Sequence, residues 1–151
     1  MIDRRESREY WLKDVDFSVS KNGKSFDIEV KWDNKISDSG AMFIELITNI
    51  QEGRIGWANY TEADVIFYGD AMRQVFYVFG VDDMREYIKT HIGEYRTQTA
   101  NDYNKNTGQI VKQSLGAIVP IEDFKHYYEV QEIDITERLK KEPRKWPCKA
   151  F

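Results

Sequence analysis

The sequence predicts an α/β (α+β) protein built on a central mixed β-sheet that is flanked by helices. Residues 26–32 alternate apolar and charged side chains with the period of two that a half-buried strand requires. Residues 41–47, 63–68 and 75–79 are mostly apolar on both faces, and strands of that kind need a covering layer on each side. Residues 84–92 repeat apolar side chains at helical spacing and supply one of the helices.

The composition is typical of one folded domain, and we expect residues 1–151 to form it. Aromatic residues make up 14% of the chain and charged residues 32%, unlike a disordered segment. No apolar run approaches the roughly 18 residues of a membrane span, and residues 1–8 lack the apolar core of a signal peptide, so we expect a cytoplasmic protein. The net charge of −4 argues against indiscriminate coating of nucleic acid but permits local binding.

Few side chains of this chain can bind a metal through nitrogen or sulfur. The only cysteine is Cys148, and the only histidines are His91 and His126. These numbers exclude an internal disulfide framework and a cysteine-rich zinc site. A metal site would therefore be built from oxygen ligands, which suit Mg²⁺ or Mn²⁺. His91 lies on the apolar stripe of the helix predicted at 84–92, where we expect it to pack rather than to bind metal.

The first elements that the sequence predicts are a weakly patterned helix and a hairpin. The helix falls within residues 3–12, which are rich in Arg and Glu. Residues 14–20 alternate apolar and polar side chains and predict a strand. The Asn22-Gly23 pair that follows favours a tight turn, so this strand should lie antiparallel to the strand at 26–32.

The strand at 26–32 has two chemically different faces. We expect the apolar face to be core; its side chains are Phe26, Ile28, Val30 and Trp32. The other face carries Glu29 and Lys31, whose Cα atoms would lie about 6.6 Å apart. This is the spacing of the Glu-x-Lys half of a metal-dependent nuclease site, although a solvated strand face produces the same pattern.

Glu45 is the one charged residue in the apolar strand at 41–47. An unpaired carboxylate there would cost several kcal/mol, so Glu45 should be partnered, metal-bound or at a cavity wall.

The second half of the chain is harder to interpret. Residues 94–108 are polar and predict a long loop that is functional or mobile. The segments after it predict one or two strands, a helix and a last element, at 110–119, 121–128 and 133–141. The basic stretch 140–145 predicts a solvated tail, beside which Trp146 would either stack on a base or pack on the core.

The order of these elements resembles the PD-(D/E)xK nuclease superfamily, in particular its small phage and Holliday-junction-resolvase-like branches. The resemblance covers residues 14–80 well and the rest poorly. It rests on an Asp-bearing strand, a hairpin and a series of short motifs, namely Ile28-Glu29-Val30-Lys31 with Asp33 after it, Phe43-Ile44-Glu45, Gly56-Trp57 and Ala63-Asp64. The chain departs from the pattern in one respect, because no proline precedes either candidate Asp.

The resemblance implies a restriction-endonuclease-like fold and a divalent metal held by two carboxylates and a carbonyl. In this chain the metal ligands would be Asp16, Glu29 and the carbonyl of Val30, and the catalytic residues Asp16, Glu29 and Lys31, with Lys31 near the attacking water. Asp14 is the alternative to Asp16, because the two share a face of the predicted strand. Asp16 is preferred because it lies nearer the hairpin.

The implied activity is a Mg²⁺- or Mn²⁺-dependent endonuclease that hydrolyses DNA phosphodiester bonds, with selectivity for branched structures left open. Because the net charge is negative, phosphate contacts must come from a local cluster, for which we select Arg96, Lys105 and Lys112. A homodimer is compatible with small nucleases of this type, and a phage-encoded enzyme would act in the host cytoplasm. The alternative is an inactive nuclease-fold scaffold that binds nucleic acid or a partner protein.

Overall fold

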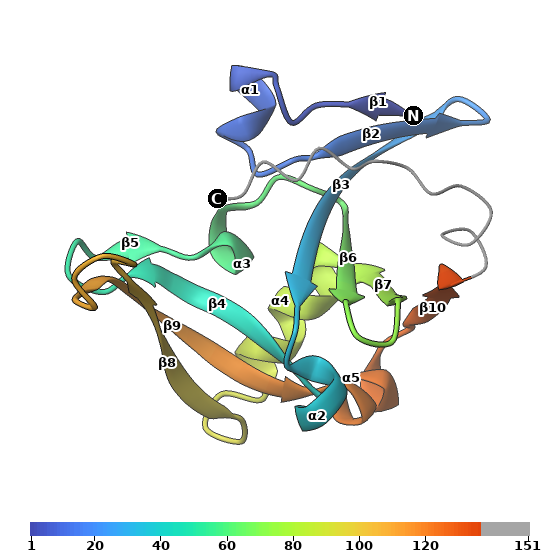
Figure 1. Ribbon diagram of the computed structural model, residues 1–151. Helices are drawn as coiled ribbons and strands as arrows, with labels where there is room; N and C mark the ends of the chain where they lie inside the picture. The colour runs from blue at the N-terminus through green and yellow to red at the C-terminus, as the bar shows by residue number, and fades with distance from the viewer. Residues whose placement is uncertain (137–151) are drawn as a thin grey trace.

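The computed structural model describes residues 1–136 of the chain (Figure 1). Its helices are α1 (Arg8–Trp11), α2 (Ile36–Ser39), α3 (Trp57–Tyr60), α4 (Val81–Thr90) and α5 (Ile121–Tyr127). Its strands are β1 (Ile2–Asp3), β2 (Phe17–Lys21), β3 (Lys24–Asp33), β4 (Ala41–Asn49), β5 (Arg54–Ile55), β6 (Val65–Asp70), β7 (Val75–Gly80), β8 (Arg96–Tyr103), β9 (Ile110–Pro120) and β10 (Gln131–Asp134). No helix among these residues is long and apolar enough to cross a membrane.

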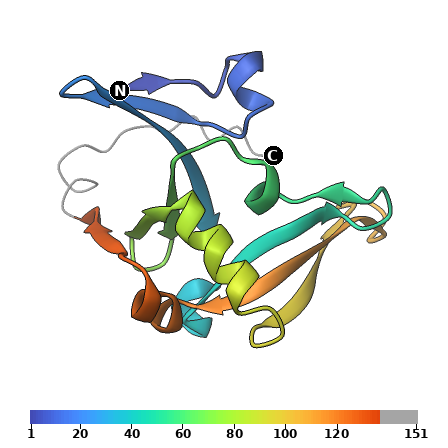
Figure 2. The same ribbon diagram turned by 180° about the vertical axis from the view of Figure 1, so that it is seen from behind.

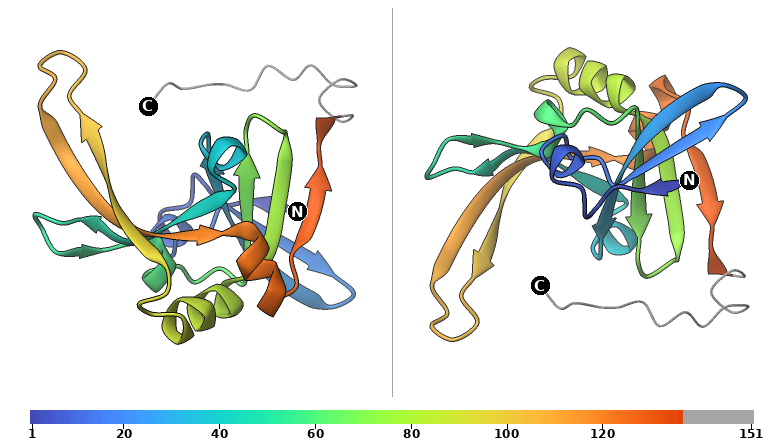
Figure 3. Two further views of the ribbon diagram at one scale, coloured as in Figure 1. Left: turned by 90° about the horizontal axis from the view of Figure 1, so that it is seen from below. Right: turned by 90° about the horizontal axis from the view of Figure 1, so that it is seen from above.

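The strands form two sheets (Figures 1 and 3). The first has the order β1-β2-β3-β6-β7-β10; β3 and β6 run parallel and its other neighbouring pairs run antiparallel. The predicted mixed central sheet is therefore confirmed. The second sheet has the order β5-β4-β9-β8 and is antiparallel throughout. The sequence pattern predicts the apolar strand β4, but it does not reveal that β4 belongs to a second sheet.

The predicted hairpin between β2 and β3 is confirmed, but its first strand is shorter than expected. Asn22 and Gly23 both have positive φ, 53° and 75°, and Lys21 pairs with Lys24 across the turn. The strand predicted from residue 14 begins only at Phe17. Asp14 lies in a turn with φ 55°, the left-handed region that Asp tolerates better than most residues. The prediction that Asp14 and Asp16 share one face of this strand is thus wrong, because side chains do not alternate regularly through a turn.

The two faces of β3 are partitioned as predicted, but the core lies on the opposite side. Glu29 pairs with Ile66 of β6 and Lys31 pairs with Tyr68, and both β6 residues belong to the buried core. Trp32, on the apolar face, is instead 55% exposed. The charged face of β3 therefore looks into the molecule, toward the second sheet.

Helices α4 and α5 close the core on that inner side, and α4 lies in front of the strands in the rear view (Figure 2). Met84 and Tyr87 of α4 are buried, and Phe124 of α5 packs edge-on against Phe79 of β7 at 5.1 Å between ring centroids. His91 stacks on the Tyr87 ring at 4.2 Å, so the prediction that it packs is confirmed. The helix predicted within 3–12 is reduced to the short α1, because the chain first pairs with β2 through β1 and the Arg4 N–H then donates to the Asp16 carbonyl.

The prediction of a loop at 94–108 is wrong, because most of this segment forms strand β8. This strand pairs with β9 from Arg96 opposite Ile118 to Tyr103 opposite Ile110, and the resulting ribbon projects from the body of the molecule (Figure 3). Backbone pairing with β9 is enough to form a ribbon that projects into solvent. Strand β8 buries neither face in a core, so its sequence shows no alternation of apolar and polar residues. The helix predicted at 121–128 is confirmed as α5, and the last predicted element begins as β10. The remainder of that element, the basic stretch 140–145, Trp146 and Cys148 lie outside the described residues.

Candidate active site

Lys31 lies between two carboxylates that come from different parts of the chain. Its Nζ atom donates a hydrogen bond to Oδ2 of Asp14 at 3.1 Å and forms an ion pair with Oε1 of Glu29. The Glu29 side chain is only 5% exposed, whereas those of Lys31 and Asp14 retain contact with solvent. Two of the predicted catalytic residues, Glu29 and Lys31, therefore meet directly, and Asp14 joins them.

Asp16 reaches the same site through the backbone of β3. Its Oδ2 atom accepts a hydrogen bond from the Val30 N–H at 2.9 Å, and its own N–H donates to the Ile28 carbonyl at 2.9 Å. The N–H and C=O of one strand residue point to the same edge, so the Val30 carbonyl also faces this side. The pairing between β2 and β3 ends at Phe17 and Ile28, so the Val30 carbonyl lies beyond the last residue pair of these two strands.

Burial and like charges favour protonation of this cluster. The pKa of Glu29 is raised to about 8; burial is the largest cause, Lys31 opposes the shift, and nearby Asp14 and Asp16 add to it. Burial also raises the pKa of Asp16. Burial alone would lower the pKa of Lys31, but Glu29 and Asp14 together raise it. Three carboxyl groups thus share one lysine, so a cation that binds here would favour their deprotonated forms.

The turn that carries Asp14 is fixed by residues that sequence analysis did not identify. The hydroxyl of Thr61, a residue only 2% exposed, donates to the Asp14 carbonyl at 2.9 Å, and the Glu62 N–H donates to the Lys13 carbonyl at 2.8 Å. Arg85 of α4 donates in turn to the Thr61 carbonyl at 2.7 Å. Thr61 lies in no alternating or helical pattern, and the one signal that could have found it is its position two residues before the Ala63-Asp64 motif.

The Gly56-Trp57 motif places an aromatic ring against the lysine. The Nζ atom of Lys31 lies 5.2 Å from the centre of the Trp57 ring, within the range of a cation–π interaction. A Cβ atom on Gly56 would come within 2.3 Å of the Glu45 carbonyl oxygen, so only glycine permits the start of α3 to approach β4 this closely. The motif therefore limits the space around the Lys31 ammonium group.

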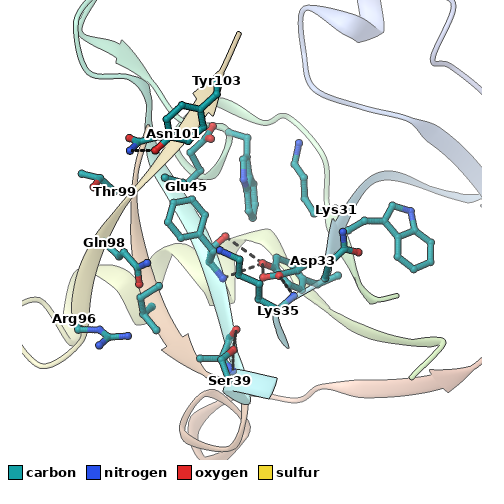
Figure 4. A pocket seen from close by; sticks show the side chains of 18 residues that line it. Lys31, Asp33, Lys35, Ser39, Glu45, Arg96, Gln98, Thr99, Asn101 and Tyr103 are labelled. Carbon is teal, nitrogen blue, oxygen red and sulfur yellow. Dashed lines mark hydrogen bonds between the residues drawn. The ribbon is translucent and has the colours of Figure 1, made fainter. Parts of the chain in front are cut away.

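A cleft of about 630 Å³ opens between the two sheets beside this cluster (Figure 4). Lys31 and Asp33 of β3 lie on one side of it, and Glu45 and the β8 side chains lie on the other. The β8 residues are mostly uncharged and polar, and the part of β8 that lines the cleft comprises Arg96, Gln98, Thr99, Ala100, Asn101 and Tyr103. Of the three alternatives predicted for Glu45, the structure shows the position at a cavity wall.

The three predicted substrate contacts do not lie together. Arg96 lines the cleft at the base of β8. Lys105 is exposed in the turn between β8 and β9, and Lys112 lies on β9 opposite Asp102. Neither lysine lines the cleft, so only Arg96 shares a cavity with Lys31.

The oxygen donors near Lys31 match the chemistry of Mg²⁺ and Mn²⁺, which prefer carboxylate and carbonyl ligands. The donors are the carboxylates of Asp14, Asp16 and Glu29 and the carbonyl of Val30. Within residues 1–136, no three His, Cys, Asp or Glu side chains are already gathered as a ligand group. A cation would therefore have to compete with Lys31 for the carboxylates of Asp14 and Glu29.

Comparisons of the chain with models of known protein families, with curated proteins and with solved structures found no match. Function therefore has to be inferred from the chemistry of the cluster and the cleft.

Proposed function

We propose that this protein is a Mg²⁺- or Mn²⁺-dependent endonuclease of the PD-(D/E)xK superfamily that hydrolyses DNA phosphodiester bonds. The observation that carries the proposal is the placement of the Lys31 ammonium group between the carboxylates of Asp14 and Glu29 at the wall of the cleft. A buried carboxylate and a lysine two residues apart on one strand, with an Asp contributed by the turn before β2, are side chains that suit this chemistry. A restriction-endonuclease-like fold is part of the same proposal.

Hydrolysis adds water across one P–O bond. The water oxygen bonds to phosphorus, the leaving oxygen departs as an alcohol with one of the water protons, and the other proton passes to solvent. Asp16 or Asp14, Glu29 and the Val30 carbonyl would hold the cation, which neutralises phosphate charge and makes a bound water more acidic. The ammonium group of Lys31 orients the water and stabilises the negative charge that develops on the phosphate oxygens.

The surroundings of Lys31 suit that role. Asp14 and Glu29 hold the ammonium group from two directions, and the Trp57 ring limits its movement on another side. A lysine fixed in this way stabilises the transition state without first having to reorganise. DNA would approach through the cleft, where Arg96 supplies a phosphate contact, and along the ribbon that carries Lys105 and Lys112.

The decisive experiment incubates the purified protein with linear and branched DNA, with and without Mg²⁺ or Mn²⁺. Wild type should cut in a metal-dependent manner, and Lys31→Ala should lower the rate by roughly a hundredfold or more, a loss of about 3 kcal/mol of transition-state stabilisation. Lys24→Ala changes an exposed lysine of the same strand and should cut at the wild-type rate.

The outcomes separate the enzyme from the scaffold alternative. If wild type and Lys31→Ala cut equally well, the role given to Lys31 is wrong. If wild type binds DNA but cuts none of the substrates with either metal, the protein is a scaffold. In that case Lys31→Ala should lower the stability of the fold without any cleavage to lose, because it leaves the buried Glu29 carboxyl group without its ion-pair partner.

A further inference from the structure

The first sheet has a second apolar face, opposite the core, which we call the outer face. It is formed by Val30 and Trp32 of β3, Phe67 of β6, Phe76 and Val78 of β7, and Ile133 of β10. The register places them in two rows, because Trp32, Gly69, Phe76 and Ile133 are successive partners across four strands, and so are Val30, Phe67 and Val78 across three.

Side chains of the outer face are all partly or largely exposed, in contrast to the aliphatic and aromatic side chains of the inner face. None of the six is buried, and Trp32 is 55% exposed. On the inner face of the same strands, the five residues Ile66, Tyr68, Val75, Tyr77 and Phe79 are all buried. Because α4 and α5 also pack on the inner side, residues 1–136 provide no second layer for the outer face.

The aromatic side chains of the outer face are nevertheless ordered against one another. The ring centroids of Trp32 and Phe76 lie 4.6 Å apart, and those of Phe67 and Phe76 lie 5.8 Å apart. A Cβ atom on Gly69 would come within 2.4 Å of the Trp32 ring, so the glycine lets this ring lie across β6. Soluble proteins rarely leave a contiguous apolar sheet face of this extent in water, and sheets with two apolar faces are covered on both.

We propose that residues 137–151 of the same chain cover the outer face. The chain reaches this face at β10, where Ile133 pairs with Phe76 and the Ile135 N–H donates to the Gln74 carbonyl at 3.0 Å. The segment has 15 residues, which span up to about 50 Å when extended and about 22 Å as a helix. The distance from β10 to β3 is three strand spacings, or about 14 Å. The segment is therefore long enough to cross the whole face.

The composition of the segment fits this position. Leu139, Trp146 and Phe151 supply apolar side chains. The segment contains six Lys or Arg and two Asp or Glu, a net charge of +4, whereas residues 1–136 contain sixteen Lys or Arg and 24 Asp or Glu, a net charge of −8. A second copy of the chain would bring another strongly acidic body against the sheet, so opposite charge favours the segment over self-association. The inference does not depend on the proposed function, since its test needs neither metal nor DNA.

The single cysteine of the chain lies in this segment and offers a direct test. A nitroxide attached to Cys148 of the isotope-labelled full-length protein should broaden the backbone amide signals of Val30, Phe67 and Phe76 and remove most of their intensity. Reduction of the nitroxide should restore them. The amides of Lys105 and Thr107, in the turn of the ribbon, serve as controls and should keep full intensity. If the outer-face signals are unaffected, or if those of Arg96 and Gln98 in the cleft broaden instead, the inference is overturned.

A mixed sample distinguishes the segment from a second copy. Isotope-labelled Cys148→Ser protein is mixed with unlabelled chains that carry the nitroxide, so that only contacts between chains broaden its signals. Unchanged signals support packing within one chain, and broadened outer-face signals overturn it. As an independent measurement, Trp146→Ala should increase binding of a dye that reports exposed apolar surface and lower Tm, whereas Lys149→Ala should change neither. Equal behaviour of the two variants would count against the inference.

Discussion

The ammonium group of Lys31 lies 3.1 Å from Oδ2 of Asp14, a residue that reaches β3 from a turn rather than from a strand. The left-handed backbone of Asp14, at φ 55°, directs its carboxylate to the lysine, while Asp16 two residues later binds the backbone of β3. Asp16, which sequence analysis preferred as the metal ligand, and its alternative Asp14 therefore make different contacts, and this difference can be tested.

We expect Asp16→Asn to weaken Mn²⁺ binding more than Asp14→Asn. The Asp14 carboxylate is already engaged with Lys31, whereas Oδ1 of Asp16 accepts no hydrogen bond from the described residues. Glu29→Ala should abolish binding in either case, because it removes the most buried of the three carboxylates. Isothermal titration calorimetry measures all three variants. A larger loss in Asp14→Asn would identify Asp14 as the ligand and Asp16 as the residue that positions β3.

Thr61→Val should loosen the turn that carries Asp14. The substitution keeps the shape of the side chain but removes the hydroxyl, so the Asp14 carbonyl and the Ala63 N–H each lose a partner. Unpaired buried polar groups of this kind cost about 1–3 kcal/mol, and cleavage should fall as Lys31 loses its fixed partner. Thr61→Ser retains the hydroxyl and is the control. Urea unfolding measures the loss of stability, and DNA nicking measures the loss of cleavage. If Thr61→Val and Thr61→Ser behave equally in both assays, the hydroxyl does not fix the turn.

Local signals in the sequence predicted much of the central sheet. The Asn22-Gly23 pair identified the hairpin because both residues tolerate the positive φ that a tight turn needs. Alternation along β3 placed Glu29 and Lys31 on one face, and the structure keeps them there. Alternation divides a strand into two faces but does not say which one the rest of the chain covers. The core was therefore placed on the wrong side of β3.

Other features depend on contacts between distant residues and leave no local signal. The turn at Asp14 is fixed by Thr61 through a hydrogen bond that spans 47 positions of the sequence. The ribbon of β8 and β9 lacks an apolar alternation because most side chains of β8 are exposed, so a strand looked like a loop. The assignment of β4 to a second sheet depends on its pairing with β9, far along the chain.

The stability of the metal-free protein should fall as pH rises from about 4.5 toward 8. The pKa of Glu29 is about 8 in the folded protein and has its ordinary value of 4.5 in the unfolded chain, so the folded state binds more protons between these values. One proton limits the slope to about 1.4 kcal/mol per pH unit. The raised pKa of Asp16 adds a loss of the same sign near the acid end of the window, and the raised pKa of Lys31 acts only at alkaline pH.

Glu29→Gln tests this dependence, because glutamine cannot ionise. Urea unfolding at a series of pH values across the window should show a clearly flatter profile for Glu29→Gln than for wild type. If both proteins lose stability with the same slope, the pKa of Glu29 is not the cause.

Charge reversal at Arg96 should weaken DNA binding more than charge reversal at Lys105 or Lys112. Arg96 lines the cleft with Lys31, whereas the two lysines lie farther along the ribbon. Each lost phosphate contact should also reduce the slope of log affinity against log salt by about one. Fluorescence anisotropy over a range of salt concentrations measures both quantities.

Lys24→Glu, at the far end of β3, is the control for the general effect of added negative charge. If Arg96→Glu weakens binding no more than this control, DNA does not enter through the cleft. The contact would then move to the basic residues Arg144 and Lys145, which lie outside the described residues.

Tyr68→Phe should destabilise the protein because this hydroxyl joins the two sheets. The Tyr68 oxygen accepts a hydrogen bond from the Phe43 N–H of β4 at 2.9 Å and donates to Oδ2 of Asp33 at 2.8 Å. Burial, with Asp33 adding to it, raises the pKa of Tyr68 well above its usual value, so the hydroxyl remains protonated and able to donate. Phenylalanine fills the same space but leaves the Phe43 N–H and the Asp33 carboxylate without this partner, at a cost of about 1–3 kcal/mol.

Tyr77→Phe provides the matched control for that loss. Tyr77 is buried on the same face of the neighbouring strand β7, but its hydroxyl accepts a hydrogen bond at 3.0 Å from Arg73, in the turn between β6 and β7. Because Tyr68 and Phe43 both line the cleft, Tyr68→Phe should also raise KM for DNA cleavage while Tyr77→Phe leaves it unchanged. Urea unfolding and steady-state kinetics compare the two variants. If Tyr68→Phe costs no more stability than Tyr77→Phe and leaves KM unchanged, the hydroxyl does not hold the sheets in the arrangement that forms the cleft.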